Sequence, residues 1–259
     1  MMPVTPITSN QIVRTADIVC VPMRDAVTTV LVEAPFEGDI LQKKIIESGG
    51  AFQDFLRPSL EQLIRRALLQ FSGVKHTAVD DLEKYVSEVF DGTVSLTGIP
   101  FPEKKGFLAY MVRPDGLDED FALAQIIKRF NVGKYTRMSP VAQHINRKAE
   151  QKRPQGTYVF AHVGGDEPDK KHLGKSYDDS IAQKMIFAGG LDYLLMTGYH
   201  MWKHEKWMDV KGWTRTSSVW SDGGTVDGCF RSDYRKLGLD GVGRDSRGAF
   251  AGPRELFLG

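Results

Sequence analysis

The stretch from Gly212 to the C-terminus constrains the fold most, because its glycines interrupt any long helix. Short runs rich in Trp, Thr, Ser and Val alternate there with Gly-Gly, Asp-Gly and Gly-Pro pairs. β-branched and aromatic residues favour strands, and the glycine-containing pairs favour tight turns between them. The pattern predicts four or five short strands joined by turns in this part of the chain.

Helices and strands are mixed along the rest of the chain. Apolar residues at helical spacing predict helices at 39–48, from 59 onward, at 80–90, at 118–130, from 176 to about 187 and at 191–207. Short apolar runs predict strands at 12–21, 28–32, 107–112 and 157–162. Ser176 and Asp179 form a capping-box pattern at the start of one helix. The sequence therefore predicts an α+β protein, with a mixed N-terminal half followed by two helices and short antiparallel strands.

A change of character at residues 131–156 predicts the division between these halves. This segment holds Pro140, Pro154 and the charged run Asn146–Arg153. Such a segment is typical of a linker or an exposed surface, and its charges suit either a solvated face or an anionic partner. We expect a docking or assembly domain at 1–150 and a second domain at 151–259.

The charge balance bears on partners and location. Lys and Arg total 34 and Asp and Glu total 33, so the net charge is +1 and nucleic acid is not indicated as a partner. No run of 18 apolar residues exists and no secretory signal precedes the first strand, so no membrane partner is expected. We expect a cytoplasmic protein, or a virion component if the chain is phage-encoded.

The histidines His200 and His204 are the clearest candidate metal ligands. They lie four residues apart in a predicted helix, so both imidazoles can face the same way, as two ligands of a divalent metal ion require. The acidic loop at 166–169 suits a hard cation or a solvated turn, and its Asp166 is one candidate third ligand. The spacing does not select among Asp166 and the alternatives, which are His162, His172 and Asp209. Histidines without any metal are the other reading.

Complete catalytic signatures are missing from the sequence. It contains no Gly-x-Ser-x-Gly motif, and the glycines of 238–243 lack a following helix and the Lys-Ser/Thr of a phosphate-binding loop. Cys229 would serve as a nucleophile only with a histidine beside it in space, and a small buried thiol is the favoured reading. Whether the chain is an enzyme stays open, with a non-enzyme favoured.

All four tryptophans lie close together in the sequence, at 202, 207, 213 and 220. Trp is a common anchor residue in binding surfaces, and it equally fills the core of a small glycine-rich domain. Both readings remain open at this stage.

Residues 157–259 resemble a known fold. The elements that carry the likeness are the helix beginning Lys175-Ser176-Tyr177-Asp178-Asp179, a second helix, the run Gly212-Trp213-Thr214-Arg215-Thr216-Ser217-Ser218-Val219-Trp220, and the segment Gly243–Gly248. Together they resemble the C-type-lectin-like fold, in the branch shared by formylglycine-generating enzymes and the variable binding proteins of phages and retroelements. Those enzymes use a pair of cysteines near the end of the fold, whereas here Cys229 stands alone.

The resemblance therefore implies display of a binding surface by the loops at 221–228 and 240–252. The ligand-binding residues that it implies are Trp213, Trp220, Asp222, Asp227, Arg244 and Arg247.

Two functional hypotheses follow. The first is a non-enzymatic binding or assembly protein, such as a phage or prophage structural component, with a protein partner or larger assembly and with homo-oligomers among its forms. The second is a metal-dependent hydrolase with a site at His200 and His204.

Overall fold

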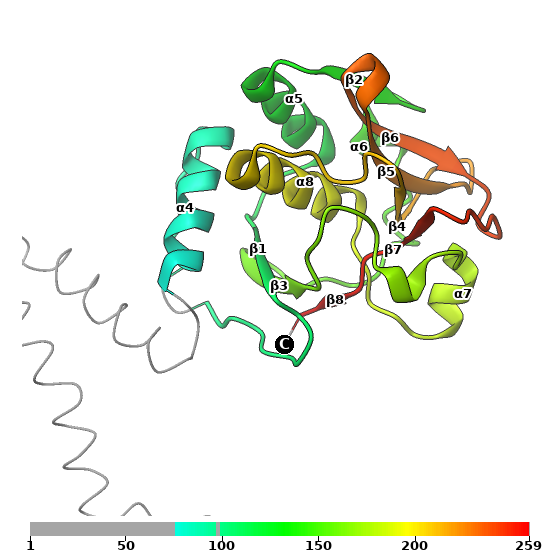
Figure 1. Cartoon of the computed structure of the whole chain (residues 1–259), viewed down its shortest axis with the longest axis horizontal. Helices are drawn as coiled ribbons and strands as arrows, with labels where there is room; N and C mark the ends of the chain where they lie inside the picture. The colour runs from blue at the N-terminus through cyan, green and yellow to red at the C-terminus, as the bar shows by residue number, and fades with distance from the viewer. Residues whose placement is uncertain (1–75, 97–98, 259) are drawn as a thin grey trace, which may run out of the picture. The chain divides into compact units, whose positions relative to one another are not determined.

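The computed structural model describes residues 76–96 and 99–258 (Figure 1). From Thr77 onward these residues form one compact unit. Its helices are α4 (His76–Phe90), α5 (Glu119–Phe130), α6 (Val141–His144), α7 (Tyr177–Ala182) and α8 (Gly190–His204). Its strands are β1 (Ala109–Arg113), β2 (Gly133–Thr136), β3 (Tyr158–His162), β4 (Trp213–Val219), β5 (Thr225–Arg231), β6 (Lys236–Val242), β7 (Ala251–Pro253) and β8 (Leu256–Phe257). The expected α+β class is confirmed, and the elements predicted before residue 76 lie outside the described residues.

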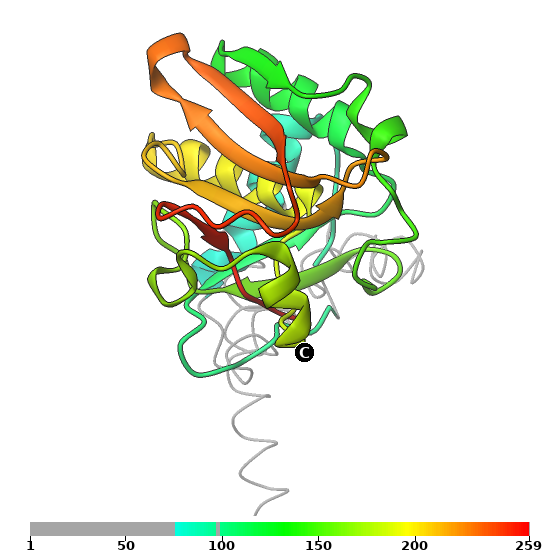
Figure 2. The ribbon, with the colours of Figure 1, turned by 90° about the vertical axis from the view of Figure 1, so that its right-hand side faces the viewer.

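The strands form two sheets. One has the order β1-β3-β8 and is antiparallel, with Ala109 opposite His162 at one end of the β1–β3 pair and Arg113 opposite Tyr158 at the other. The second has the order β2-β6-β5-β4-β7, antiparallel in its centre and parallel at both edges. The short strands predicted after Gly212 are confirmed as β4 to β8, and Figure 2 shows β4, β5 and β6 side by side.

Helix α8 lies at the centre of the unit and contacts both sheets (Figure 1). It packs against β1 of the small sheet, against β4 and β5 of the large one, and beside α5. Its first nine residues, from Gly190 to Gly198, are all buried. Close approach needs glycine at two positions. A Cβ on Gly228 of β5 would come within 2.3 Å of the Tyr193 ring, and one on Gly198 within 2.4 Å of the Tyr85 hydroxyl.

Local capping sets several helix ends. The carboxylate of Asp118 accepts the backbone N–H of Phe121 at the start of α5, which begins one residue after the expected position. The predicted capping box of Ser176 and Asp179 is confirmed at the start of α7. That helix ends at Ala182 rather than near 187, because Met185 and Phe187 leave the helix to pack with Tyr177 and Val219.

The expected division after residue 150 is not visible as a gap within the described part of the chain. Strands β1 and β3 pair across it, and so do β2 and β6. The segment 131–156 itself contributes β2 and α6 to this unit.

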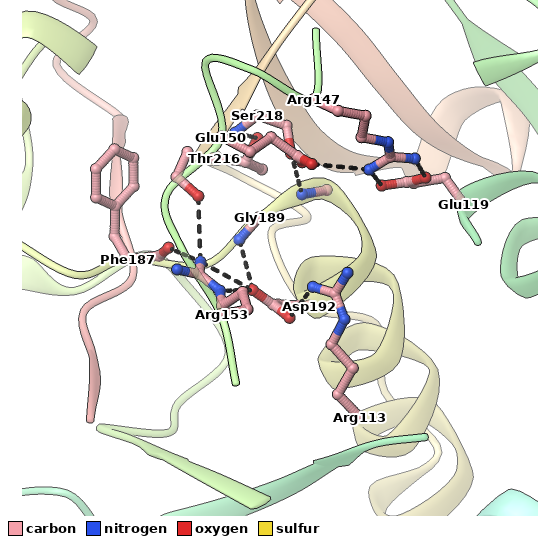
Figure 3. Close-up of polar contacts among 12 residues, drawn as sticks. Arg113, Glu119, Arg147, Glu150, Arg153, Phe187, Gly189, Asp192, Thr216 and Ser218 are labelled. Carbon is pink, nitrogen blue, oxygen red and sulfur yellow. Dashed lines mark hydrogen bonds and ion pairs between the residues drawn. The ribbon is translucent and has the colours of Figure 1, made fainter. Parts of the chain in front are cut away.

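A network of buried charges ties that segment to α8 (Figure 3). Asp192, in the first turn of α8, accepts hydrogen bonds from Arg113 of β1, from Arg153 and from the backbone of Gly189. A second group joins Arg147 to Glu119 and Glu150. The charged run predicted at 146–153 therefore turns Glu150 and Arg153 inward, while Arg147 reaches the buried Glu119 from the surface, so the run does not form only a solvated face.

Candidate functional site

The main candidate site is a cavity of about 420 Å³ at the C-terminal half of α8. The helix contributes Tyr199, His200 and His204 to its wall, and β3 contributes His162. The loop that follows β3 adds Asp166, and Lys206 closes the rim. We call this the histidine cavity.

The two helical histidines lie side by side, and Asp166, one of the candidate third ligands that the spacing left open, lies next to His200. The ring centroids of His200 and His204 lie 4.8 Å apart. The Nε2 atom of His200 lies 3.1 Å from Asp166 Oδ1. This contact has an ion-pair distance without hydrogen-bond geometry, so the buried Nε2 atom has no hydrogen-bond partner within the described structure. Asp166 itself is 61% exposed, so its carboxylate faces solvent at the mouth of the cavity.

Burial lowers the pKa of two histidines of the cavity, His162 and His200. Burial first, and then the nearby Arg254 and His200, lower the pKa of His162 to about 3. Its Nδ1 atom accepts the backbone N–H of Gly164 at 3.2 Å, which places the ring proton on Nε2. Burial, with His204 nearby, also lowers the pKa of His200 and outweighs the opposing effect of Asp166. Near neutral pH both rings therefore act as neutral hydrogen-bonding groups.

The low pKa of His162 predicts a pH dependence of stability. Its folded-state value of about 3 is below the ordinary 6.5, so between these values the unfolded chain binds the extra proton. The contribution of His162 to the free energy of unfolding is therefore complete above about pH 6.5. Below that pH it falls by up to about 1.4 kcal/mol per pH unit. Urea unfolding from pH 7 to 4 should show a shallower fall for His162→Asn than for wild type. Parallel profiles for the two proteins would contradict the assignment.

The geometry does not favour a metal centre. In residues 76–96 and 99–258, no three His, Cys, Asp or Glu side chains are arranged to hold a metal ion. Two of the other proposed third ligands are engaged elsewhere, whereas His162 lines the cavity. His172 contacts Glu255, at 3.2 Å from Nε2, and Asp209 forms a buried ion pair with Arg254. The cavity instead offers neutral imidazoles, one carboxylate, one ammonium group and a phenol, which can hydrogen-bond a ligand.

The residues that the lectin-like resemblance implied for ligand binding are scattered between core and surface. Trp220 is fully buried, and its indole N–H donates to the Asp240 carbonyl at 3.0 Å. Asp227 is buried against Arg215, at 3.0 Å between Oδ2 and Nη2. Neither side chain offers surface to a ligand in this structure.

The other four of these residues reach the surface, each beside a charged or aromatic neighbour. Trp213 is half-buried, with the Arg231 guanidinium 5.1 Å from its ring centroid. Asp222 accepts a hydrogen bond from Arg137 at 2.8 Å. Arg244 and Arg247 pair with the α7 residues Asp178 and Asp179. These contacts fix the loops at 221–224 and 243–250, and the four side chains do not share a pocket with the histidine cavity.

Cys229 shows no sign of a nucleophile. It is buried, and burial raises its thiol pKa to about 12, so the reactive thiolate is suppressed near neutral pH. The histidine cavity has no Ser, Thr or Cys side chain among its described lining residues.

The sequence did not point to three residues whose side chains can bind a ligand: Arg113, Arg153 and Tyr158. They line a second pocket, of about 490 Å³, at the other end of the β1–β3 pair. One signal was present, because an arginine that follows the apolar run of a predicted strand needs a buried or interfacial partner. The partner itself, Asp192, lies too far along the chain to be identified from spacing.

Comparisons of the chain with protein-family models, with curated proteins and with solved structures find no match. From residue 157 the structure has two helices and then short strands, and the C-type-lectin-like resemblance stays a prediction. None of the helices in the described ranges has the length and apolar character needed to cross a membrane.

Proposed function

We propose that this protein is a non-enzymatic binding protein whose unit from residue 77 onward takes a small, neutral, hydroxyl-bearing ligand in the histidine cavity. The observation that carries the proposal is the buried His200 Nε2 atom. It lies 3.1 Å from the exposed Asp166 carboxylate in poor hydrogen-bond geometry, and His200 lines a cavity of about 420 Å³. A buried polar atom left without a partner is costly, so a ligand that supplies one is favoured.

The charges of the cavity select a neutral ligand. With His162 and His200 uncharged, the negative Asp166 and the positive Lys206 balance each other at its wall. Hydroxyl groups both donate and accept hydrogen bonds, so they can serve the carboxylate and the imidazole at once. The side chains of Met196 and Met208 and the ring of Tyr199 supply apolar surface for the carbon skeleton. A sugar combines these two properties.

The wider role that we propose is a component of a larger assembly, such as a phage particle. It rests on the lectin-like resemblance, and light scattering of the purified chain would show whether a defined assembly forms. The metal-dependent hydrolase gains no support from the described residues, because no metal-holding group is found among them. Stoichiometric zinc in protein purified without a histidine tag would reverse that preference.

Titration with methyl glycosides of glucose, galactose and mannose tests the sugar proposal. Imidazole signals of His200 and His204 should shift and saturate in NMR spectra of the full chain, while His144 of α6, outside the cavity, should not move. Asp166→Ala should weaken the binding about tenfold or more, because a hydrogen bond to a charged group is lost.

Asp178→Ala is the matched control, since it removes an exposed carboxylate far from the cavity lining. Two results would count against the proposal. One is the absence of any shift at the cavity histidines with every glycoside at millimolar concentration. The other is equal binding by wild type and Asp166→Ala.

A further inference from the structure

The second pocket and the histidine cavity lie at opposite ends of the β1–β3 strand pair. Arg113 and Tyr158 face each other across β1 and β3, whereas Ala109 and His162 face each other at the cavity end. Arg153 approaches from the segment before β3, and the turns at 114–117 and 154–156 complete the wall of a pocket of about 490 Å³. This volume is enough for a small molecule or the end of a peptide.

Two buried donors of this pocket lack acceptors. Tyr158 is 7% exposed, and its hydroxyl has no hydrogen-bond partner in the described structure. Arg153 uses its Nη2 and Nε atoms on Phe187, Ser217 and Asp192, but its buried Nη1 atom has no partner either. Both residues line the pocket. Buried donors in folded proteins nearly always find an acceptor, so the two atoms point to an acceptor from outside the described residues.

The inner wall of the pocket holds two guanidinium groups, which share one carboxylate. Asp192 is the carboxylate between Arg113 and Arg153, as Figure 3 shows, and its oxygens are already occupied by both guanidinium groups and by the Gly189 N–H. One buried carboxylate therefore serves two guanidinium groups. The carboxylates of Glu119 and Glu150 are bonded to Arg147 and to Ser218 instead.

Asp115 favours a ligand with a single negative charge over one with two. This exposed residue lines the pocket, so its carboxylate would repel a second negative charge on the ligand. A guanidinium edge and a phenolic hydroxyl also suit the two oxygens of a planar carboxylate.

We propose that Arg113, Arg153 and Tyr158 form a binding site for a singly charged carboxylate group, borne by a small molecule or a peptide end. The two arginines supply the charge, and Tyr158 Oη and Arg153 Nη1 donate the hydrogen bonds. The site is separate from the histidine cavity, so the experiments can contradict one proposal without contradicting the other.

Acetate and propionate are the probes, added to the full chain against chloride at constant ionic strength. In protein labelled with ¹⁵N-arginine, the side-chain signals of Arg113 and Arg153 should shift and saturate with either carboxylate. Inorganic phosphate should bind more weakly than acetate near neutral pH, because the dianion is repelled by Asp115. A peptide with a free C-terminus, compared with its amidated form, then separates a peptide end from a small acid.

Tyr158→Phe is the decisive variant, because it removes only a hydroxyl that has no acceptor among the described residues. It should unfold at the same or slightly higher denaturant concentration than wild type, yet bind acetate about tenfold more weakly. Tyr193→Phe is the matched control. It too removes a buried hydroxyl without a partner, at a residue outside this pocket, and should leave acetate binding unchanged.

Three outcomes would overturn the proposal: acetate and chloride acting alike on the arginine signals, Tyr158→Phe binding acetate as wild type does, or phosphate binding more tightly than acetate.

Discussion

Replacement of Asp192 by alanine is expected to lower the free energy of unfolding by about 3–5 kcal/mol, the usual result of removing one partner from a buried ion pair. The carboxylate is fully buried and accepts hydrogen bonds from Arg113 at 2.9 Å, from Arg153 at 3.1 Å and from the Gly189 N–H at 2.8 Å. Burial alone would raise its pKa, but Arg153 and Arg113 outweigh burial, and the pKa is lowered. Without it, two guanidinium groups are left facing each other in a poorly solvated site.

Urea unfolding at neutral pH measures this loss. Asp192→Asn keeps the shape and an acceptor for Gly189, so it should lose less than the alanine variant. Asp178→Ala is the surface control, because that carboxylate and its partner Arg244 are both about half exposed, and it should cost less than about 1 kcal/mol. Equal losses in Asp178→Ala and Asp192→Ala would show that the network contributes little to stability.

Replacement of Asp227 by alanine should also cost about 3–5 kcal/mol of stability. The sequence placed this residue in a ligand surface, whereas the structure buries it beside Arg215, its cross-strand partner on β4. Arg215 donates from Nη2 to Asp227 at 3.0 Å, and its Nη1 atom donates to the Lys175 and Ser246 carbonyls. Loss of Asp227 leaves this buried guanidinium without its counter-charge.

A double substitution separates the two readings of Asp227. Arg215→Met with Asp227→Leu removes both charges, so it should recover much of the stability lost in Asp227→Ala, because an apolar pair of similar size often replaces a buried ion pair at little cost. Recovery stays incomplete, since the Lys175 and Ser246 carbonyls lose their donor. If Asp227→Ala unfolds at the wild-type urea concentration, the residue is not structural, and the ligand surface becomes the better explanation.

Features set by neighbouring residues were predictable from the sequence. The capping box of Ser176 and Asp179 depends on residues three apart, and the shared face of His200 and His204 depends on residues four apart. The α5 helix and the short strands after Gly212 follow from periodicity and turn residues in the same way. In each case the interacting groups are close in the chain, so local geometry alone brings them together.

The long-range contacts were decided only by the tertiary structure. Arg113 and Asp192 meet although they are 79 residues apart, and Arg153 meets the same carboxylate from 39 residues away. The sequence left Trp220 open to a core or a surface role, and the resemblance implied a surface role for Asp227. The structure buries both, with Trp220 bonded to the Asp240 carbonyl and Asp227 paired with Arg215. The sequence by itself determined the α+β class, the capping box at the start of α7 and the shared face of His200 and His204. Only the tertiary structure decided which charges are buried and which donors lack acceptors, because burial depends on which distant segments pack together.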